Sequence, residues 1–367
     1  MIRSSPPRPW RLAAVALAAA GAAGCFACGA PTFTVREGAA LSPGPPPSLS
    51  GPRVRALHLA DFGDRTRQQD AVASAVIDAH RRAPFQLAVF PGDNIYDCGA
   101  DTALPGAEGC RFAEDGNTLA PGFTPPADPW FGRHEEPLAG LAGIPVYLAL
   151  GNHDVSPCGA PDPVAGARLK ACLEVAHASP LWTMPGRHYV VDQGPARFIV
   201  VDSNLVKRDY GGFRLEDEVT FVARAAEGCA AGRFCFLVGH HPPVTAGTHR
   251  KEATPQYVAR MDQLLQAGGG RIRAWLAGHD HDLQHLRSPG GLDVLVSGNG
   301  SRGRPAERFQ HVSVPGARLL FASVRWGYAV LEVAPDGWTY RFEGEGGAPL
   351  YCCAAAGDGP CEPVRCE

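Results

Sequence analysis

Side chains with metal-ligand chemistry recur in five short segments of this 367-residue chain. The segments contribute Asp61; Asp93 and Tyr96; Asn152 and His153; His240; and His279 and His281. Carboxylate, phenol, amide and imidazole groups without a thiolate favour hard or borderline cations such as iron, manganese and zinc. A set of about seven or eight such groups is too large for one ion and suits two. The residue types therefore predict a binuclear metal site, provided that the fold brings the five segments together.

Each of the five segments follows an apolar run, which indicates how the fold could bring them together. The runs cover residues 54–60, 85–90, 144–150, 234–238 and 272–276, and each is expected to be a strand. Because α/β sheets place ligands beyond the carboxyl ends of their strands, the five segments are expected at one edge. Taken alone, Gly92-Asp93-Asn94 would be an ordinary turn. The agreement of five segments favours a functional site instead.

Helical and turn patterns complete the expected organisation. Residues 68–82 place Val72, Val76 and Ala79 at helical spacing between two of the strands, which predicts a βαβ unit. A second helix is expected over residues 254–266, before a run of three glycines. Further strands are expected over residues 188–191, 197–202, 292–297, 326–333 and 338–342, the last two as a hairpin.

The composition is that of a folded, mildly acidic protein. Hydrophobic residues make up 45% of the chain and charged residues 19%, which predicts a globular core. The formal net charge is −3, and nucleic-acid binding is not expected because it requires a basic face.

The N-terminus has the pattern of an export signal. Arg3, Arg8 and Arg11 precede a short apolar run over residues 12–23, which is too short for a permanent membrane span. The run ends in Ala22-Ala23-Gly24-Cys25, so we expect residues 1–24 to be a lipoprotein signal peptide and Cys25 to be lipidated. Ala22 stands where such signals usually carry leucine, and ordinary cleavage with secretion is the alternative. Residues 25–52 are expected to form a proline-rich tether between a membrane-anchored Cys25 and the folded domain.

The twelve cysteines are consistent with an exported protein. Beyond residue 28 they form local groups, which are Cys98 with Cys110, Cys158 with Cys172, Cys229 with Cys235, and Cys352, Cys353, Cys361 and Cys366. We expect five disulfides, with local bridges closing the irregular segment 97–128 and residues 158–172, although spacing alone does not determine connectivity.

The segments, taken together and in order, resemble the calcineurin-like metallophosphoesterases. Within them the chain is similar to the purple acid phosphatases, especially the small tartrate-resistant type. The matching blocks are Asp61-Phe62-Gly63, Gly92-Asp93-Asn94-Ile95-Tyr96, Gly151-Asn152-His153-Asp154, Gly239-His240 and Gly278-His279-Asp280-His281. The resemblance implies an α/β (α+β) fold, a four-layer αββα sandwich of two mixed β-sheets flanked by helices. It places the domain at residues 53–345 and leaves residues 346–367 as a cysteine-rich C-terminal tail.

The same resemblance implies a ligand set for each metal. The first metal would be held by Asp61, Asp93, Tyr96 and His281, and the second by Asp93, Asn152, His240 and His279, with Asp93 bridging. Gly63 and Tyr96 distinguish the subgroup, since other members carry histidine at the first position and lack the tyrosine ligand. A phenolate favours Fe(III), and the second ion would be divalent iron, zinc or manganese.

The function implied by the resemblance is hydrolysis of small phosphate monoesters by a metal-activated hydroxide. His153 would contact phosphate and protonate the leaving group, and Asp154 could orient His153. His241 would either touch the substrate or only support a ligand. The alternatives are a phosphodiesterase or nucleotide hydrolase on the same metals and, from another class, a non-catalytic surface binding protein. The expected location is exported and membrane-anchored, periplasmic or on the cell surface.

Overall fold

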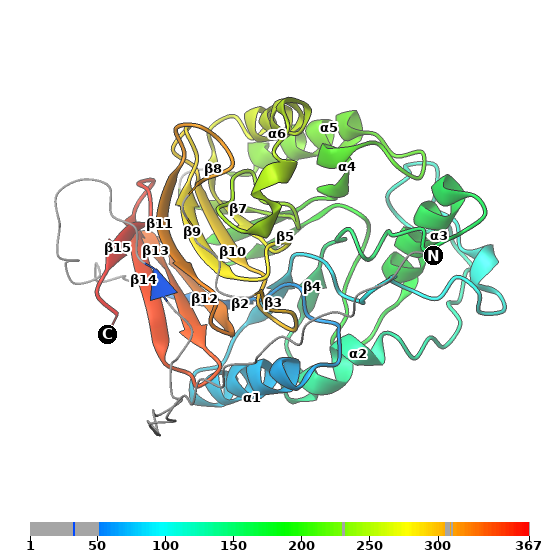
Figure 1. Ribbon diagram of the computed structural model, residues 1–367, viewed down its shortest axis with the longest axis horizontal. Coiled ribbons are helices and arrows are strands. Elements are labelled where there is room, and N and C mark those ends of the chain that lie inside the picture. Colours follow the sequence, from blue (N-terminus) through cyan, green and yellow to red (C-terminus); the bar gives the residue numbers. More distant parts are fainter. Residues whose placement is uncertain (1–31, 34–50, 230–231, 305–308, 310, 367) are drawn as a thin grey trace, which may run out of the picture.

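Two β-sheets packed face to face form the centre of the protein, seen in the computed structural model of Figure 1. The structure describes residues 32–33, 51–229, 232–304, 309 and 311–366. The signal peptide, Cys25 and most of the expected tether therefore lie outside the described residues. No helix among the described residues is long and apolar enough to cross a membrane.

The larger sheet has eight strands in the order β1-β11-β9-β10-β8-β7-β6-β5. Their bounds are β1 (Thr32–Phe33), β5 (Tyr189–Gln193), β6 (Ala196–Val200), β7 (Phe234–Val238), β8 (Ile272–Ala277), β9 (Leu283–Arg287), β10 (Asp293–Ser297) and β11 (Arg318–Ser323). Strands β6, β7, β8 and β10 run parallel, whereas β1, β5, β9 and β11 pair antiparallel. The sheet is therefore mixed, as the resemblance implied.

The smaller sheet has seven strands in the order β15-β14-β13-β12-β2-β3-β4. Their bounds are β2 (Val54–His58), β3 (Leu87–Phe90), β4 (Val146–Leu148), β12 (Gly327–Ala334), β13 (Gly337–Gly344), β14 (Pro349–Ala356) and β15 (Glu362–Val364). The expected hairpin is confirmed as β12 and β13, with Ala334 opposite Gly337. Residues 349–364 of the C-terminal tail extend the sheet as β14 and β15.

Helices cover the outer faces of the two sheets (Figure 1). They are α1 (Arg67–Arg82), α2 (Gly132–Glu135), α3 (Pro163–Ala176), α4 (Asn204–Lys207), α5 (Leu215–Glu227) and α6 (Pro255–Ala267), with 3-10 turns η1 (Ala107–Gly109), η2 (Glu136–Leu141) and η3 (Thr248–Glu252). Both expected helices are confirmed. Thr66 caps α1 by accepting a hydrogen bond from the backbone N–H of Gln69, and Thr254 caps α6 from Tyr257 in the same way.

Strands β9 and β11 did not emerge from the sequence pattern. Strand β9 buries Gln284 and His285, which interrupt the apolar run that marks a fully buried strand. His285 is satisfied by the hydroxyl of Tyr351 at 2.8 Å and the carboxylate of Asp293 at 3.0 Å. Tertiary partners therefore make polar residues acceptable in the core at these positions.

Five disulfides join the ten cysteines of the described residues, but two of the expected local bridges are wrong. The pairs are Cys98–Cys158, Cys110–Cys172, Cys229–Cys235, Cys352–Cys366 and Cys353–Cys361. Cys98 and Cys110 do not bond to each other, because the fold lays the irregular segment 97–128 against α3 and the segment that leads into it. The two bridges of this region therefore tie segment 97–128 to Cys158 and to Cys172 of α3 instead of closing each segment on itself.

Candidate metal centre

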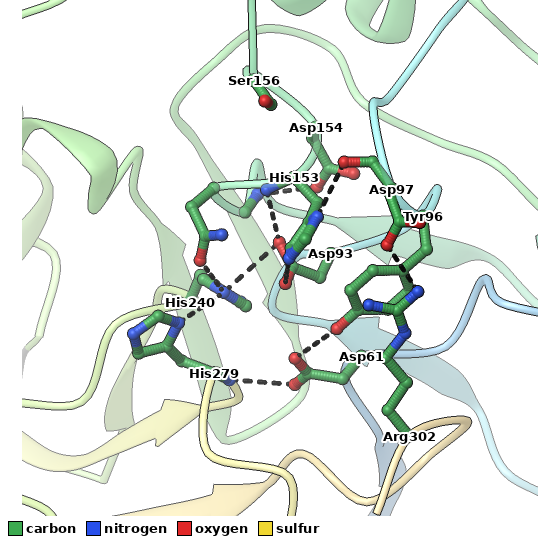
Figure 2. A network of polar contacts seen from close by, with 12 residues as sticks. Asp61, Asp93, Tyr96, Asp97, His153, Asp154, Ser156, His240, His279 and Arg302 are labelled. Carbon is green, nitrogen blue, oxygen red and sulfur yellow. Dashed lines mark hydrogen bonds and ion pairs between the residues drawn. The ribbon is translucent and has the colours of Figure 1, made fainter. Parts of the chain in front are cut away.

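All seven predicted metal ligands lie together at the carboxyl ends of β2, β3, β4, β7 and β8. Figure 2 labels five of them, which are Asp61, Asp93, Tyr96, His240 and His279. Ligand atoms of Asp61, Asp93 and His240 lie within 4.8 Å of one another, and all three side chains are buried. The expectation of a single sheet edge is wrong, because β2, β3 and β4 belong to the smaller sheet and β7 and β8 to the larger one, so the site lies where the two sheets meet.

One half of the site is formed by Asp61, Tyr96 and His281. The Tyr96 hydroxyl donates to Oδ1 of Asp61 at 2.8 Å and lies 3.3 Å from Nε2 of His281. Nε2 of His281 is 3.4 Å from the same carboxylate oxygen, while its buried Nδ1 has no hydrogen-bond partner. Burial and the carboxylates of Asp61 and Asp93 raise the pKa of Tyr96 well above its usual value. A phenolate forms here only if a cation displaces the proton.

The other half is formed by Asn152, His240 and His279. Nε2 of His240 lies 3.1 Å from Oδ1 of Asn152 and 3.2 Å from Nδ1 of His279. Nδ1 of His240 donates to the carbonyl of Pro91 at 2.9 Å, which leaves Nε2 to face the site. Burial lowers the pKa of His279 to about 4, so this imidazole is neutral and has a lone pair to offer.

Asp93 lies between the two halves. Its Oδ1 accepts the backbone N–H of His153 at 2.9 Å and lies 3.4 Å from Nε2 of His240. Burial raises the pKa of Asp93, but the positive charge of His240 outweighs burial and the net shift is downward. Burial lowers the pKa of His240, but the charge and hydrogen bond of Asp93 outweigh burial and raise this pKa to about 9. The pair therefore holds a proton strongly, at the place where a bound cation would replace it.

Strained backbone and close glycine contacts position these ligands. Asp61, Asp93 and His279 have φ values of 57°, 53° and 73°, in the left-handed region that costs energy for residues other than glycine. A Cβ on Gly151 would lie 2.2 Å from Oδ1 of Asp93, and one on Gly278 would lie 2.4 Å from Oδ2 of Asp61. The loops approach the carboxylates so closely that side chains at these two positions would collide with them.

His153 points into the site, but Asp154 does not orient it as expected (Figure 2). Nδ1 of His153 is held by the carbonyl of Asp97 at 2.7 Å, and Nε2 lies 3.9 Å from Oδ2 of Asp93. The buried carboxylate of Asp154 instead accepts backbone N–H groups of Asn94, Ile95 and Gly151 at 2.7–3.1 Å. Burial and the charge of Asp93 raise the pKa of Asp154 to about 7. Asp154 therefore fixes the two ligand loops against each other.

His241 is buried beside the second half of the site. Its backbone N–H donates to the hydroxyl of Ser203 at 2.9 Å, and its Nδ1 lies 3.1 Å from that hydroxyl. Its Nε2 has no partner, and its ring centroid is 4.5 Å from that of His279. Burial and the neighbouring histidines lower the pKa of His241 well below its usual value.

The site contains contacts that sequence reasoning missed. Glu252 lies 3.0 Å from Nε2 of His279, His249 stacks on His279 with ring centroids 4.0 Å apart, and Arg302 lies 3.9 Å above the ring of Tyr96. His249, Glu252 and His279 form a further cluster of possible metal ligands. None of the missed residues belongs to a recognisable strand-end block, so only their contacts identify them.

The arrangement of donors fits bound cations. The outer nitrogens of His240 and His279 are taken by the Pro91 carbonyl and the Glu252 carboxylate, and their inner nitrogens face each other at 3.2 Å. Such an approach of two lone pairs is favourable only with a shared proton or a cation between them. The unpartnered Nδ1 of His281 and the adjacent carboxylates add to this excess of acceptors. The residues present therefore fit a metal centre.

Comparison with known proteins identifies a family for this arrangement. A family model described as calcineurin-like phosphoesterase matches residues 54–283, a segment that contains all seven predicted ligands.

Curated relatives include several tartrate-resistant acid phosphatases type 5. The Oryctolagus cuniculus protein is 30% identical over 122 residues, covering 32% of this chain and 36% of the relative. The Sus scrofa protein is 22% identical over 336 residues, covering 82% of this chain and 86% of the relative. Purple acid phosphatase 7 of Arabidopsis thaliana is 39% identical over 67 residues, covering 18% and 19%. The alignments with the rabbit and Rattus norvegicus proteins span 36% and 56% of those relatives.

Solved structures share the fold at low sequence identity. GAP50, described as the anchor in the inner membrane complex of Plasmodium, has a TM-score of 0.61 at 18% identity, covering 83% of this chain and 89% of that chain. A purple acid phosphatase from yellow lupin (Lupinus luteus) seeds has a TM-score of 0.59 at 12% identity, covering 85% and 55%.

Proposed function

Because the chain belongs to the calcineurin-like phosphoesterase family, we propose that it hydrolyses phosphate monoesters at a binuclear centre of the purple acid phosphatase type. The observation that carries this proposal is the convergence of Tyr96 with six other predicted ligand side chains on one site, where all but Asn152 are buried. A non-catalytic binding protein on this fold would have no need to keep all seven.

The predicted ligands divide into two groups that share Asp93. Asp61, Tyr96 and His281 would hold the first ion, and Asn152, His240 and His279 would hold the second. Two bound cations would lower the pKa of a water molecule and offset the negative charge of the phosphate oxygens. The phenol of Tyr96 supports Fe(III) as the first ion, with divalent iron, zinc or manganese as the second.

The chain itself supplies the proton that the leaving alcohol needs. His153 donates Nδ1–H to the Asp97 carbonyl, so Nε2 is the nitrogen that faces the site and can carry the transferred proton. Asp97 thereby fixes the direction of the ring, and Asp154 holds the loop that carries His153.

A metal analysis combined with an ester panel tests the proposal. Purified protein should contain about two metal ions per chain, one of them iron, and should hydrolyse phenyl phosphate faster than the diester diphenyl phosphate. Faster cleavage of the diester would favour the phosphodiesterase alternative. A metal-loaded protein that cleaves neither ester would contradict catalysis.

The five disulfides favour an oxidising, extracellular or exported setting for the folded domain. We further propose that Cys25 carries the lipid that anchors the protein to a membrane. Mass spectrometry of the mature N-terminus should show an acyl mass on Cys25, and Cys25→Ser should release the protein from membranes. A mature N-terminus elsewhere, with no acyl mass, would contradict the anchor.

A further inference from the structure

A pocket of about 640 Å³ opens beside the second half of the metal site. Its lining comes from the segment after Asn152, the start of α3 and the segment from Asn204 to Gly211. Asn152 belongs to both places, because its Oδ1 lies 3.1 Å from Nε2 of His240 while the residue also lines the pocket. The volume lies in the range of small-molecule sites, so it can hold the alcohol part of an ester whose phosphate sits on the metals.

One wall of this pocket is apolar. It is built from Val155, Pro157, Pro163, Val164 and Ala167. Val164 is 59% exposed, and among the described residues it is the one large hydrophobic side chain that is exposed. Exposure of this side chain to water does not stabilise the protein, whereas burying it against an apolar ligand group would contribute favourable free energy to binding.

Another part of the lining is cationic. Lys207 and Arg208 line it at the end of α4, and the ammonium of Lys207 lies 2.7 Å from Oε2 of Glu252. That same oxygen lies 3.0 Å from Nε2 of His279, so one carboxylate separates Lys207 from a predicted metal ligand.

Arg208 is the uncommitted cation of the pocket. Within the described part of the chain its exposed guanidinium has no hydrogen-bond or ion-pair partner. The nearby acid Asp209 does not serve it, because the Asp209 carboxylate pairs with Arg260. Arg208 is therefore free to pair with an anionic group of a ligand.

A second pocket, which shares Pro157 with the first, lacks this property. It has about 560 Å³ and is lined by Tyr96 and Asp97 among others. Its two cations are already used, since Lys170 donates to the backbone carbonyls of Cys98 and Ala100, and Arg133 donates to that of Tyr96 at 2.8 Å.

We propose that the pocket between Asn152, Val164 and Arg208 binds the leaving group and selects phosphate esters whose alcohol part is apolar and carries a second anionic group. The inference rests on the proposed phosphomonoesterase function and names its substrate class. Arg208 acts here as a specificity-determining residue, while the metal ligands bind the phosphate that all such esters share.

Two matched pairs of compounds test the inference on the metal-loaded full chain. Phenylphosphonate and 4-phosphonobenzoate are not hydrolysed and differ by one carboxylate, and calorimetry compares their binding. Phenyl phosphate and 4-carboxyphenyl phosphate form the corresponding hydrolysable pair, and KM compares them. The wild type should favour the carboxylated member of each pair about 3- to 10-fold, the range of a partly exposed ion pair.

Substitutions at Arg208 should then change the preference. Arg208→Ala should bring both ratios to about one, and Arg208→Glu should reverse them. Arg224→Ala is the matched control, because it removes an exposed arginine of α5 that does not line the pocket, and it should leave the ratios unchanged. If the ratios do not change in the Arg208 variants but phenyl phosphate is still hydrolysed, the inference is wrong and the proposed function stands. An Arg208-dependent preference between the phosphonates without any hydrolysis would support the pocket and sink the proposed function.

Discussion

The carboxylate of Glu252 joins a predicted metal ligand to a lysine at the rim of the site. Its Oε2 lies 3.0 Å from Nε2 of His279 and 2.7 Å from Nζ of Lys207. Burial raises the pKa of Glu252, but the hydrogen bonds and charges of His279 and Lys207 lower it well below the usual range. Glu252 is therefore a permanent anion that fixes which nitrogen of His279 carries the proton.

Removing this anion should weaken the second metal. Glu252→Ala should reduce the affinity of the second ion about 10- to 100-fold, because His279 loses the partner that directs Nδ1 into the site. Glu252→Gln, which can still accept the hydrogen bond, should restore part of the affinity. Competition with a chelator measures both, and Glu227→Gln on the exposed face of α5 is the control. Unchanged affinity in the alanine variant would mean that His279 is positioned by packing alone.

Replacing the phenol should remove the colour of the iron-loaded protein. A phenolate bound to Fe(III) absorbs visible light, so the oxidised wild type should be purple or pink and Tyr96→Phe colourless. Phenol itself titrates near 10, and its pKa is raised further here, so only a cation can deprotonate it at acidic pH. Visible spectroscopy and iron retention are the measurements. Tyr147→Phe is the control and should keep the absorption band. A wild type without the band, or a Tyr96→Phe variant that keeps it as Tyr147→Phe does, would show that Tyr96 is not a ligand.

The role of His153 as proton donor predicts a dependence on the leaving group. His153→Ala should keep both metals, since His153 is outside both ligand groups. It should slow esters of poorly acidic alcohols about 10²- to 10⁴-fold and phenyl esters much less. The measurement is kcat across a series of alcohols, with the exposed His311→Ala as control. An equal loss for every ester would leave His153 with a positioning role only.

Stability should fall in acid because His58 is buried in its neutral form. Its Nδ1 lies 2.7 Å from the hydroxyl of Tyr340 and its Nε2 3.1 Å from the carbonyl of Ala277. Burial lowers the pKa of His58 to about 3, below that of the unfolded chain, so the unfolded state binds the extra proton at intermediate pH. The contribution of His58 is present above about pH 6.5 and is lost as the pH falls toward 3, by about 1.4 kcal/mol per unit.

Denaturant unfolding of wild type and His58→Gln between pH 7.5 and pH 4 checks this prediction. The variant should be less stable at pH 7.5, by about 1–3 kcal/mol for the altered buried hydrogen bonds, but should lose less stability in acid. Equal losses in the two proteins would show that other groups cause the acid sensitivity.

The sequence was sufficient to predict which strand ends carry the candidate ligands, but not that these strand ends belong to two sheets. Long apolar runs such as residues 234–238 fit only buried strands, and the polar residue that follows each run must then lie at the strand end. The helical spacing of Val72, Val76 and Ala79 likewise marked α1, and the run of three glycines marked the end of α6. These features are predictable because they depend on residues that are neighbours in the chain.

Contacts between distant segments could not be predicted in this way. Cys98 pairs with Cys158 across 60 residues, although Cys110 is nearer in sequence, because loop packing decides which sulfurs meet. Buried polar residues hid β9 because their partners belong to other strands.

Residue types and order, read from the sequence alone, determined which side chains could bind metals and which strands would carry them. Only the tertiary structure decided what surrounds those side chains. It placed the Pro91 carbonyl behind His240, Glu252 behind His279 and the Asp97 carbonyl behind His153. Each contact joins two segments that are far apart in the chain, so no local sequence pattern predicts it. Each contact also fixes which nitrogen of the imidazole faces the site.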